Sequence, residues 1–113
     1  MSRETVEQYV NFEDGIEQFG SEKEFEQILF SFKKHIPDLL KKLQECSGDD
    51  YIISVHALKG SARTIYANEI GDRACELETA AKNGDWELVK SKNTGLIGDT
   101  QKLIDAIQTL QEG

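Results

Sequence analysis

The sequence predicts an all-α protein, an up-and-down antiparallel four-helix bundle with one short extra N-terminal helix. Apolar residues recur at steps of three and four along most of the chain, which is the period of a helix rather than of a strand. The predicted long helices are joined by short connections, which favour antiparallel neighbours. The 113 residues suffice for one compact core but not for two, so we expect a single domain over residues 1–113.

A short helix and a long helix come first. Apolar residues on one helical face occupy residues 6–19 and predict a short amphipathic helix packed across one end of the bundle. The sequence Ser21-Glu22-Lys23-Glu24 has the form of a capping box, so we expect the long helix to begin there and to end near residues 47–48. Pro37 is expected to bend it, because proline removes a backbone donor. Its predicted core stripe contains Phe25, Ile28, Leu29, Phe32, Ile36, Leu39, Leu40 and Leu43.

Three further helices complete the predicted bundle. The pair Asp49-Asp50 supplies an N-cap for a third helix that runs to about Ala67. A fourth is expected over about residues 69–82, ended by Asn83-Gly84. Asp85 caps the last helix, whose apolar residues follow the seven-residue repeat of neighbouring bundle helices. The inward residues of the last two helices are Ile70, Ala74, Leu77, Ala81, Val89, Leu96, Leu103, Ile107 and Leu110.

Net charge and hydropathy limit the classes of partner. The chain has 13 Lys and Arg against 21 Asp and Glu, for a formal net charge of −8. Nucleic acids and anionic membrane surfaces are bound by clustered Lys and Arg, so we expect neither as a partner. No apolar run approaches the roughly 20 residues of a bilayer span, and the first residues lack the apolar stretch of a secretory signal. We therefore expect a cytoplasmic location.

Residue spacing predicts no metal site and no cofactor site in this chain. Cys46 and Cys75 are too far apart for a zinc knuckle or a redox pair, so we interpret both as buried thiols. Neither histidine stands in a helical metal-binding motif. A glycine-rich nucleotide loop and a kinase catalytic loop are also missing from the sequence, so we do not expect the chain to use ATP itself.

The stretch from Tyr51 to Asn68 contains no acidic residue, although the chain is acidic. Placed on a helix, its apolar residues gather on one side, which we assign to the core. His56 falls on the opposite side and is therefore expected to be exposed and to titrate. The core side carries Tyr51, Val55, Leu58, Ala62 and Ile65, and the side of His56 carries Ile52, Lys59, Gly60 and Arg63.

The residues around His56 favour phosphoryl chemistry. A neutral imidazole has a nucleophilic ring nitrogen that can form a covalent phosphoryl intermediate. Lys59, about one turn further on, can steady negative charge carried by the ring. Gly60 is unfavourable inside a helix, and the usual reason for such a glycine is close approach by another molecule. His35, beside the core stripe of the long helix, is interpreted as a core or incidental surface residue.

The motif His56-Ala57-Leu58-Lys59-Gly60-Ser61, followed by Leu77-Glu78, resembles the histidine phosphotransfer (HPt) domains of bacterial phosphorelays. The resemblance extends upstream over most of the chain, to Gly15-Ile16, Phe19-Gly20-Ser21, Phe25, Leu29 and Phe32. Many family members carry a small hydroxyl residue where Ala62 stands and a glycine near Tyr66. These departures bear on packing and partner choice, because neither residue lies at the predicted reaction centre.

The resemblance implies that His56 accepts a phosphoryl group from the aspartate of one receiver domain and donates it to another. It also implies that Lys59 steadies the phosphoryl charge and that Gly60 leaves room for the acidic pocket of a receiver. The Mg²⁺ ion expected in this reaction would belong to that pocket, so no metal ligand is assigned in this chain. The expected partners are response-regulator receiver domains, of a hybrid sensor histidine kinase and of a downstream regulator.

We assign Ile52, Ile53 and Arg63 to partner binding, because they flank His56 on the predicted helix. An alternative function is a non-catalytic helical docking module that binds a receiver or kinase domain without being phosphorylated. We expect a phosphoryl carrier rather than a stand-alone enzyme, because no pair of acid and base groups is predicted to converge around His56. A monomer is expected, since one bundle accounts for most of the apolar residues.

Overall fold

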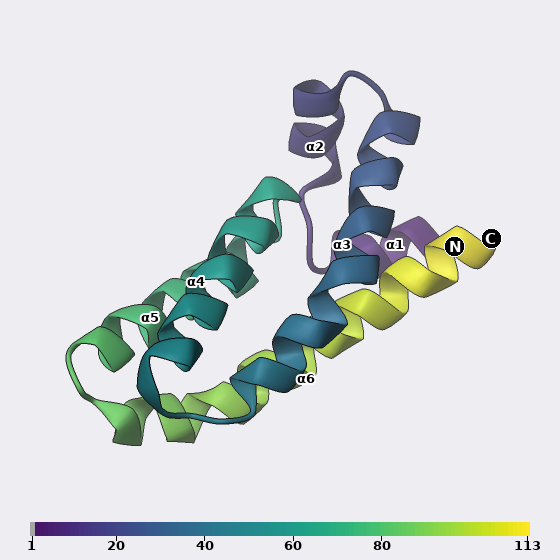
Figure 1. The fold of residues 1–113 in the computed structure, drawn as a ribbon. Coiled ribbons are helices and arrows are strands. Elements are labelled where there is room, and N and C mark those ends of the chain that lie inside the picture. Colours follow the sequence, from purple (N-terminus) through teal and green to yellow (C-terminus); the bar gives the residue numbers. More distant parts are fainter. Residues whose placement is uncertain (1) are drawn as a thin grey trace.

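The computed structural model describes residues 2–113, and every regular element among them is a helix (Figure 1). The helices are α1 (Ser2–Glu7), α2 (Phe12–Phe19), α3 (Glu22–Leu43), α4 (Gly48–Thr64), α5 (Asn68–Lys82) and α6 (Trp86–Glu112). The predicted all-α class is therefore confirmed. None of these helices is long and apolar enough to span a lipid bilayer.

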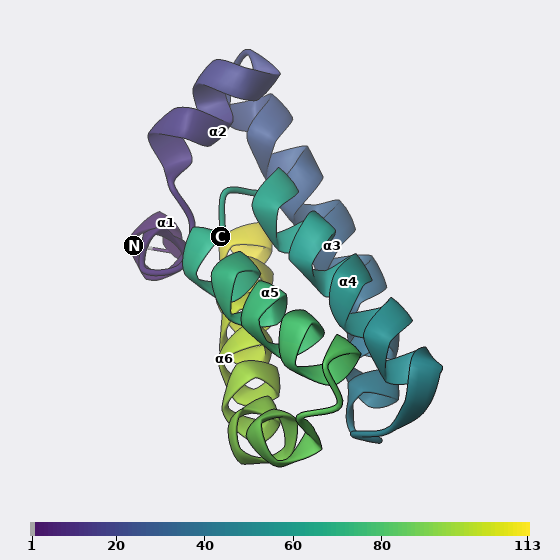
Figure 2. The same cartoon turned by 90° about the vertical axis from the view of Figure 1, so that its left-hand side faces the viewer.

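The four long helices pack in a closed ring in which α3 contacts α4, α4 contacts α5, α5 contacts α6, and α6 contacts α3. Figures 1 and 2 show the chain reversing its direction between successive helices of this ring. The two short helices lie outside the ring, with α2 packed on α3 and α1 packed on α6. This packing places α1 beside the last turns of the chain (Figure 1).

The N-terminal segment differs from the prediction, because residues 2–19 form two short helices rather than one. Asn11 begins the second of them, since its side chain accepts a hydrogen bond from the Asp14 backbone N–H at 3.1 Å. The Asn11 N–H donates to the Tyr66 carbonyl at 3.0 Å and so ties this segment to the α4–α5 turn. Both short helices bury apolar side chains against the same bundle, so the helical spacing did not reveal the break between them.

The predicted helix starts are confirmed at two positions and wrong at a third. The Ser21 hydroxyl accepts from a first-turn N–H of α3 at 3.1 Å, and the Asp85 carboxylate does the same in α6 at 3.2 Å. In contrast, α4 already begins at Gly48, so Asp49 and Asp50 lie in its first turn rather than at its N-cap. Carboxylates are favourable there because the amino-terminal end of the helix dipole is positive.

One hydrophobic core runs through the ring of long helices. Most predicted core residues are buried, whereas Ile28, Leu39 and Leu110 are half-buried. Cys46 and Cys75 are free thiols and are also only half-buried, which corrects the prediction of two buried thiols. The buried members of the predicted stripes are Phe25, Leu29, Phe32, Ile36, Leu40, Leu43, Tyr51, Val55, Leu58, Ala62, Ile65, Ile70, Ala74, Leu77, Ala81, Val89, Leu96, Leu103 and Ile107.

A buried polar contact inside the core fixes how α4 is rotated. The Tyr51 hydroxyl donates to Asn93 Oδ1 at 2.8 Å, and Asn93 Nδ2 donates to the Leu43 carbonyl at 2.8 Å. Burial raises the pKa of the Tyr51 phenol, so it remains a neutral donor. Because buried polar groups need such partners, the contact favours the single rotation of α4 that turns Tyr51 inward.

Candidate functional site

His56 lies on the outer face of α4, as the helix projection predicts. The five residues assigned to the opposite face of this helix are all buried. The His56 side chain is 64% exposed, so its ring is accessible to a second molecule. The two faces of α4 are therefore divided as expected, with packing on one side and a solvent-facing imidazole on the other.

A buried carboxylate from the neighbouring helix holds the His56 ring. Glu78 of α5 is only 4% exposed, and its Oε2 lies 2.7 Å from His56 Nδ1. An ionised carboxylate can only accept a hydrogen bond, so Nδ1 must carry the proton and donate it. In the neutral ring this arrangement leaves the lone pair on Nε2, the nitrogen that is not bound to Glu78.

Two lysines bind the same carboxylate. Lys59 Nζ lies 2.6 Å from Glu78 Oε1, and Lys82 Nζ lies 3.0 Å from Oε2. Burial by itself would raise the pKa of Glu78, but hydrogen bonds from Lys59, Lys82 and His56 outweigh it and lower the pKa to about 2. Glu78 is therefore ionised at neutral pH, and we call these four residues the His56 cluster.

Gly60 leaves an open place beside this cluster. A Cβ added at Gly60 would have no atom within 4 Å, and the Gly60 carbonyl accepts a hydrogen bond from the Thr64 hydroxyl at 2.9 Å. Gly15 shows the opposite case, because a Cβ there would overlap the ring of Phe25. Packing within the fold thus explains Gly15 but gives no reason for a glycine at position 60.

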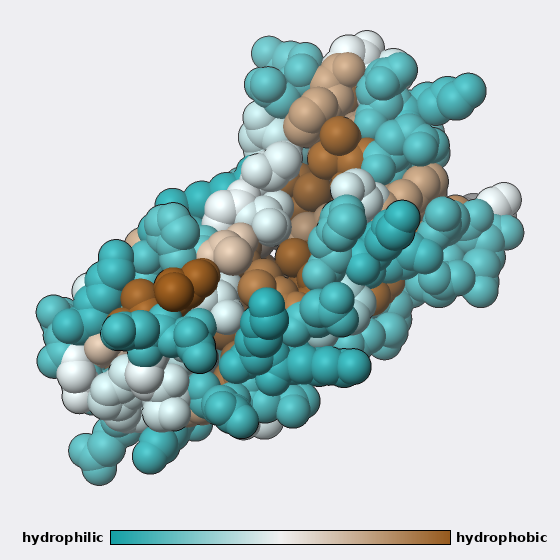
Figure 3. All heavy atoms as spheres, viewed as in Figure 1, coloured by the Kyte–Doolittle hydropathy of each residue, from teal (hydrophilic) through white to brown (hydrophobic). Residues whose placement is uncertain are grey.

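The three residues predicted to bind a partner differ in their exposure. Ile53 is 66% exposed and is the one exposed large hydrophobic residue among those described, whereas Ile52 is half-buried against the core. Arg63 is exposed, but its side chain lies across Gly71 of α5 and its Nη2 is 3.5 Å from Asp72 Oδ1. Figure 3 shows a face with many polar atoms, a small apolar group of atoms over α4, and further apolar atoms along the upper part of α3 and between α3 and α4.

Sequence reasoning did not assign Glu78 or Lys82 to the site. Glu78 was named only as part of the family motif. The prediction that no acid–base pair converges around His56 is wrong, because the Glu78 carboxylate contacts the His56 ring. A signal was nevertheless present, because Glu78 follows Ala74 by four residues and precedes Ala81 by three, which places a charged residue within a core stripe. Lys82 gave no comparable signal, since a lysine is common in the last turn of a helix.

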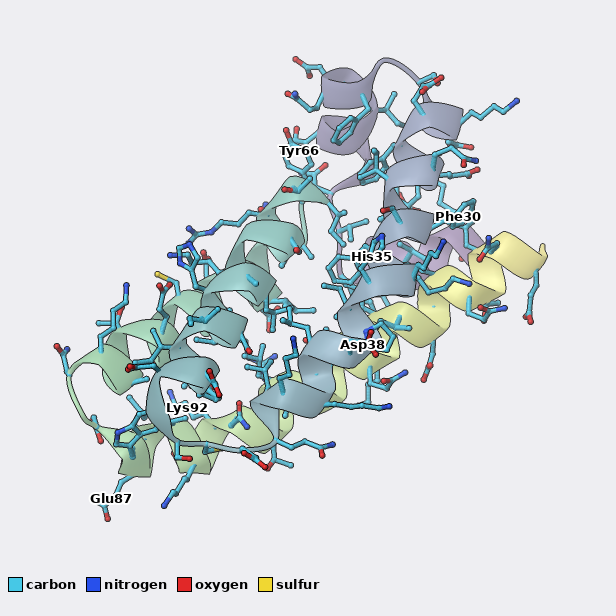
Figure 4. The ribbon with its side chains drawn as sticks, in the orientation of Figure 1. Phe30, His35, Asp38, Tyr66, Glu87 and Lys92 are labelled. Carbon is cyan, nitrogen blue, oxygen red and sulfur yellow. The ribbon has the colours of Figure 1, made fainter. Side chains whose placement is uncertain are left out.

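The other histidine among the described residues, His35, has no comparable arrangement around it. His35, labelled in Figure 4, lies exposed on α3 rather than in the core. Within residues 2–113, no three His, Cys, Asp or Glu side chains are grouped in a way that could hold a metal ion.

The family model described as Hpt domain matches residues 27–113. The match begins within α3, so it does not extend to the resemblance noted at Gly15-Ile16 and Phe19-Gly20-Ser21. Comparison with curated proteins gave no match, and comparison with solved structures gave none either.

Proposed function

The chain belongs to the Hpt domain family, and on that basis we propose that His56 carries a phosphoryl group between two receiver domains. The observation that supports this role best is the pairing of His56 Nδ1 with Glu78 Oε2 at 2.7 Å on an exposed helix face. It fixes the proton on one ring nitrogen and leaves the other free to react. Phosphotransfer in general is the function of the family, and the assignment to His56 rests on the motif that His56 begins and on this geometry.

In the proposed step, the Nε2 lone pair of His56 attacks the phosphorus of an aspartyl phosphate on the donor receiver. The N–P bond forms as the P–O bond to the aspartate breaks, and the bonding electrons leave with the aspartate carboxylate. Nδ1 keeps its proton, so the ring gains positive charge while the phosphoryl group stays negative. Glu78 stabilises that positive charge through the hydrogen bond it already accepts. Transfer to the second receiver is the reverse displacement.

Lys59 has two roles in this proposal. Its ammonium binds Glu78 Oε1 at 2.6 Å, and it stands about one helical turn beyond His56 on the same face. The contact with Glu78 helps to hold the carboxylate against the ring. The positive charge also stabilises a phosphoryl group on the neighbouring imidazole.

The open place at Gly60 and the exposed Ile53 side chain support docking of a receiver over this face. Ile52 and Arg63 complete the proposed contact surface on α4. The Mg²⁺ ion of the reaction would be held by the acidic pocket of the receiver. We further propose that one receiver belongs to a hybrid sensor histidine kinase and the other to a downstream regulator, and that the chain acts as a monomer in the cytoplasm.

The test is the intact mass of the chain after incubation with phosphoramidate, a small phosphoryl donor, for the native protein and for His56→Gln. We expect one added phosphoryl group on the native chain, labile in acid and stable in alkali, and none on the variant. Circular dichroism of both proteins controls for helix content. A folded native chain that takes up no phosphoryl group from phosphoramidate or from phosphorylated receivers would overturn the proposal in favour of a docking module.

A further inference from the structure

We propose that Lys82 is a positioning residue of the His56 cluster, which keeps the imidazole neutral and nucleophilic by offsetting the charge of Glu78. This inference rests on the proposed phosphotransfer function. It concerns a residue that lies outside the motif on which the family resemblance depends.

The geometry gives Lys82 a distinct place in the cluster. Glu78 Oε2 is shared between His56 Nδ1 at 2.7 Å and Lys82 Nζ at 3.0 Å, while Lys59 binds the other oxygen. Lys82 is therefore bound to the same oxygen atom as the histidine. It follows Glu78 by four residues on α5, a spacing that places the two side chains on one face of the helix.

The charge balance explains why a second lysine is needed. A carboxylate alone beside an imidazole favours the protonated ring, and a protonated ring has no lone pair on Nε2 with which to attack phosphorus. Lys59 cancels the charge of Glu78, and Lys82 then leaves a surplus of one positive charge before His56 is counted. That surplus opposes protonation of the free ring. It also favours the phosphorylated ring, because the two negative charges of the phosphoryl group outweigh the one positive charge that the ring gains, so both effects promote phosphorylation.

Other charged groups along α4 and α5 do not replace this surplus. Arg63 and Asp72 form the next contact along the α4–α5 boundary, and their charges balance each other. The remaining described ion pairs of α5 turn toward α6 or stay within α5; they are Arg73 with Asp99, Lys92 with Glu76, and Arg73 with Glu69.

The test measures the rate of phosphorylation by phosphoramidate at a series of pH values for Lys82→Met, Lys82→Arg and Lys90→Met. Lys90 is an exposed lysine of α6 outside the cluster, so Lys90→Met controls for the change in overall charge. Dividing each rate by the native rate at the same pH cancels the pH dependence of the donor. Thermal unfolding of each variant controls for stability.

We expect Lys82→Met to slow phosphorylation about threefold at neutral pH, the scale of a half-exposed ion pair. We also expect the ratio of the Lys82→Met rate to the native rate to fall further as the pH is lowered, because the acidic limb of the variant's rate profile moves to higher pH. Lys82→Arg should retain the native profile, and Lys90→Met should match the native rate. A purely structural role would lower the rate by the same factor at every pH and would overturn the inference. Native-like rates in Lys82→Met would also overturn it, whereas a native chain that takes up no phosphoryl group would overturn the proposed function itself.

Discussion

Two exposed histidines on neighbouring helices, His56 on α4 and His35 on α3, show what distinguishes a reactive imidazole from an ordinary one. Nδ1 of His56 is bound by the buried Glu78 carboxylate, whereas no side-chain hydrogen bond joins His35 to another described residue. His35 instead lines one pocket between α3 and α4 and another between α3 and α6. The difference lies in the facing helix, because α5 presents a buried acid to His56.

The residues that follow the two histidines sharpen the contrast. Three residues after His56 stands Lys59, whereas Asp38 stands three residues after His35 (Figure 4). A phosphoryl group is stabilised by the lysine and repelled by the aspartate. Four residues after His56 is the bare Gly60, while the corresponding residue after His35 is a leucine half-buried in the core. Each difference favours phosphorylation of His56 alone.

The largest expected effect is therefore the loss of the phosphoryl group in His56→Gln and its full retention in His35→Gln. Intact mass after treatment with phosphoramidate measures both. A third variant, His56→Gln with Asp38→Lys, gives His35 a lysine at the matching spacing but no buried acid. We expect this variant to remain unphosphorylated, and a phosphoryl group on His35 would show that the facing carboxylate is not what separates the two histidines.

The buried acid should also be visible in the stability of the fold. Its pKa is lowered from an ordinary value of 4.5 to about 2, so ionised Glu78 stabilises the folded state above pH 4.5, and this contribution is lost as the pH falls from 4.5 toward 2. We expect ionised Glu78 to add about 2 to 3 kcal/mol to the free energy of unfolding. This follows from about 1.4 kcal/mol for each unit by which its pKa is lowered, reduced somewhat by screening by solvent.

Urea denaturation of the native chain and of Glu78→Gln at a series of pH values measures this contribution. The other carboxylates titrate in both proteins, so their effects cancel in the difference between the two unfolding free energies. That difference should shrink as the pH is lowered through this window, because Glu78 becomes protonated in the native chain. A difference that stays constant with pH would contradict the assignment of an ionised Glu78 to the cluster.

Removing the carboxylate should slow the reaction about tenfold. Of the three contacts that Glu78→Ala removes, the one made with the reacting ring is the hydrogen bond from His56 Nδ1, which contributes about 1.4 kcal/mol. The ring then also loses the partner that fixes its proton on Nδ1, which ¹⁵N NMR of the imidazole detects directly. Glu76→Ala removes an exposed acid of the same helix that pairs with Lys92, and serves as the matched control. Equal rates in the two variants would argue against a role for Glu78.

Much of this arrangement was predictable from local sequence. Helical spacing predicted the buried and exposed faces of α4 correctly. Every core residue predicted there follows one helical period and is buried. The N-terminal break was missed because helical spacing continues through it, and the cap at Asn11 was the signal that could have located it.

The contact between His56 and Glu78 could not be predicted from spacing within one helix. It depends on how α4 and α5 are rotated against each other, which is fixed by long-range packing and by buried contacts such as that of Tyr51 with Asn93. The family motif marks Glu78 as present but does not state what it touches. A charged residue inside a core stripe is the general signal for such a contact, because a buried charge requires partners.

The smallest expected effect separates two glycines that look alike in the fold. Gly60 beside His56 and Gly98 on α6 both lie within helices, and a Cβ at either would have no atom within 4 Å. Alanine should therefore stabilise the chain by about 0.5 to 1 kcal/mol at each position, because it is the better helix former. Thermal unfolding of the two variants should show the same gain.

Function should distinguish the two glycines where stability does not. If a receiver approaches α4 closely at Gly60, the added methyl group should slow transfer from a phosphorylated receiver about fivefold, on the scale of 1 kcal/mol for a crowded contact. Gly98→Ala should leave that rate unchanged. Phosphoramidate is too small to need the space, so it should phosphorylate both variants at the native rate. Slowing of Gly60→Ala with phosphoramidate as well would mean that the methyl group disturbs the His56 cluster itself, and that the open place is not reserved for the receiver.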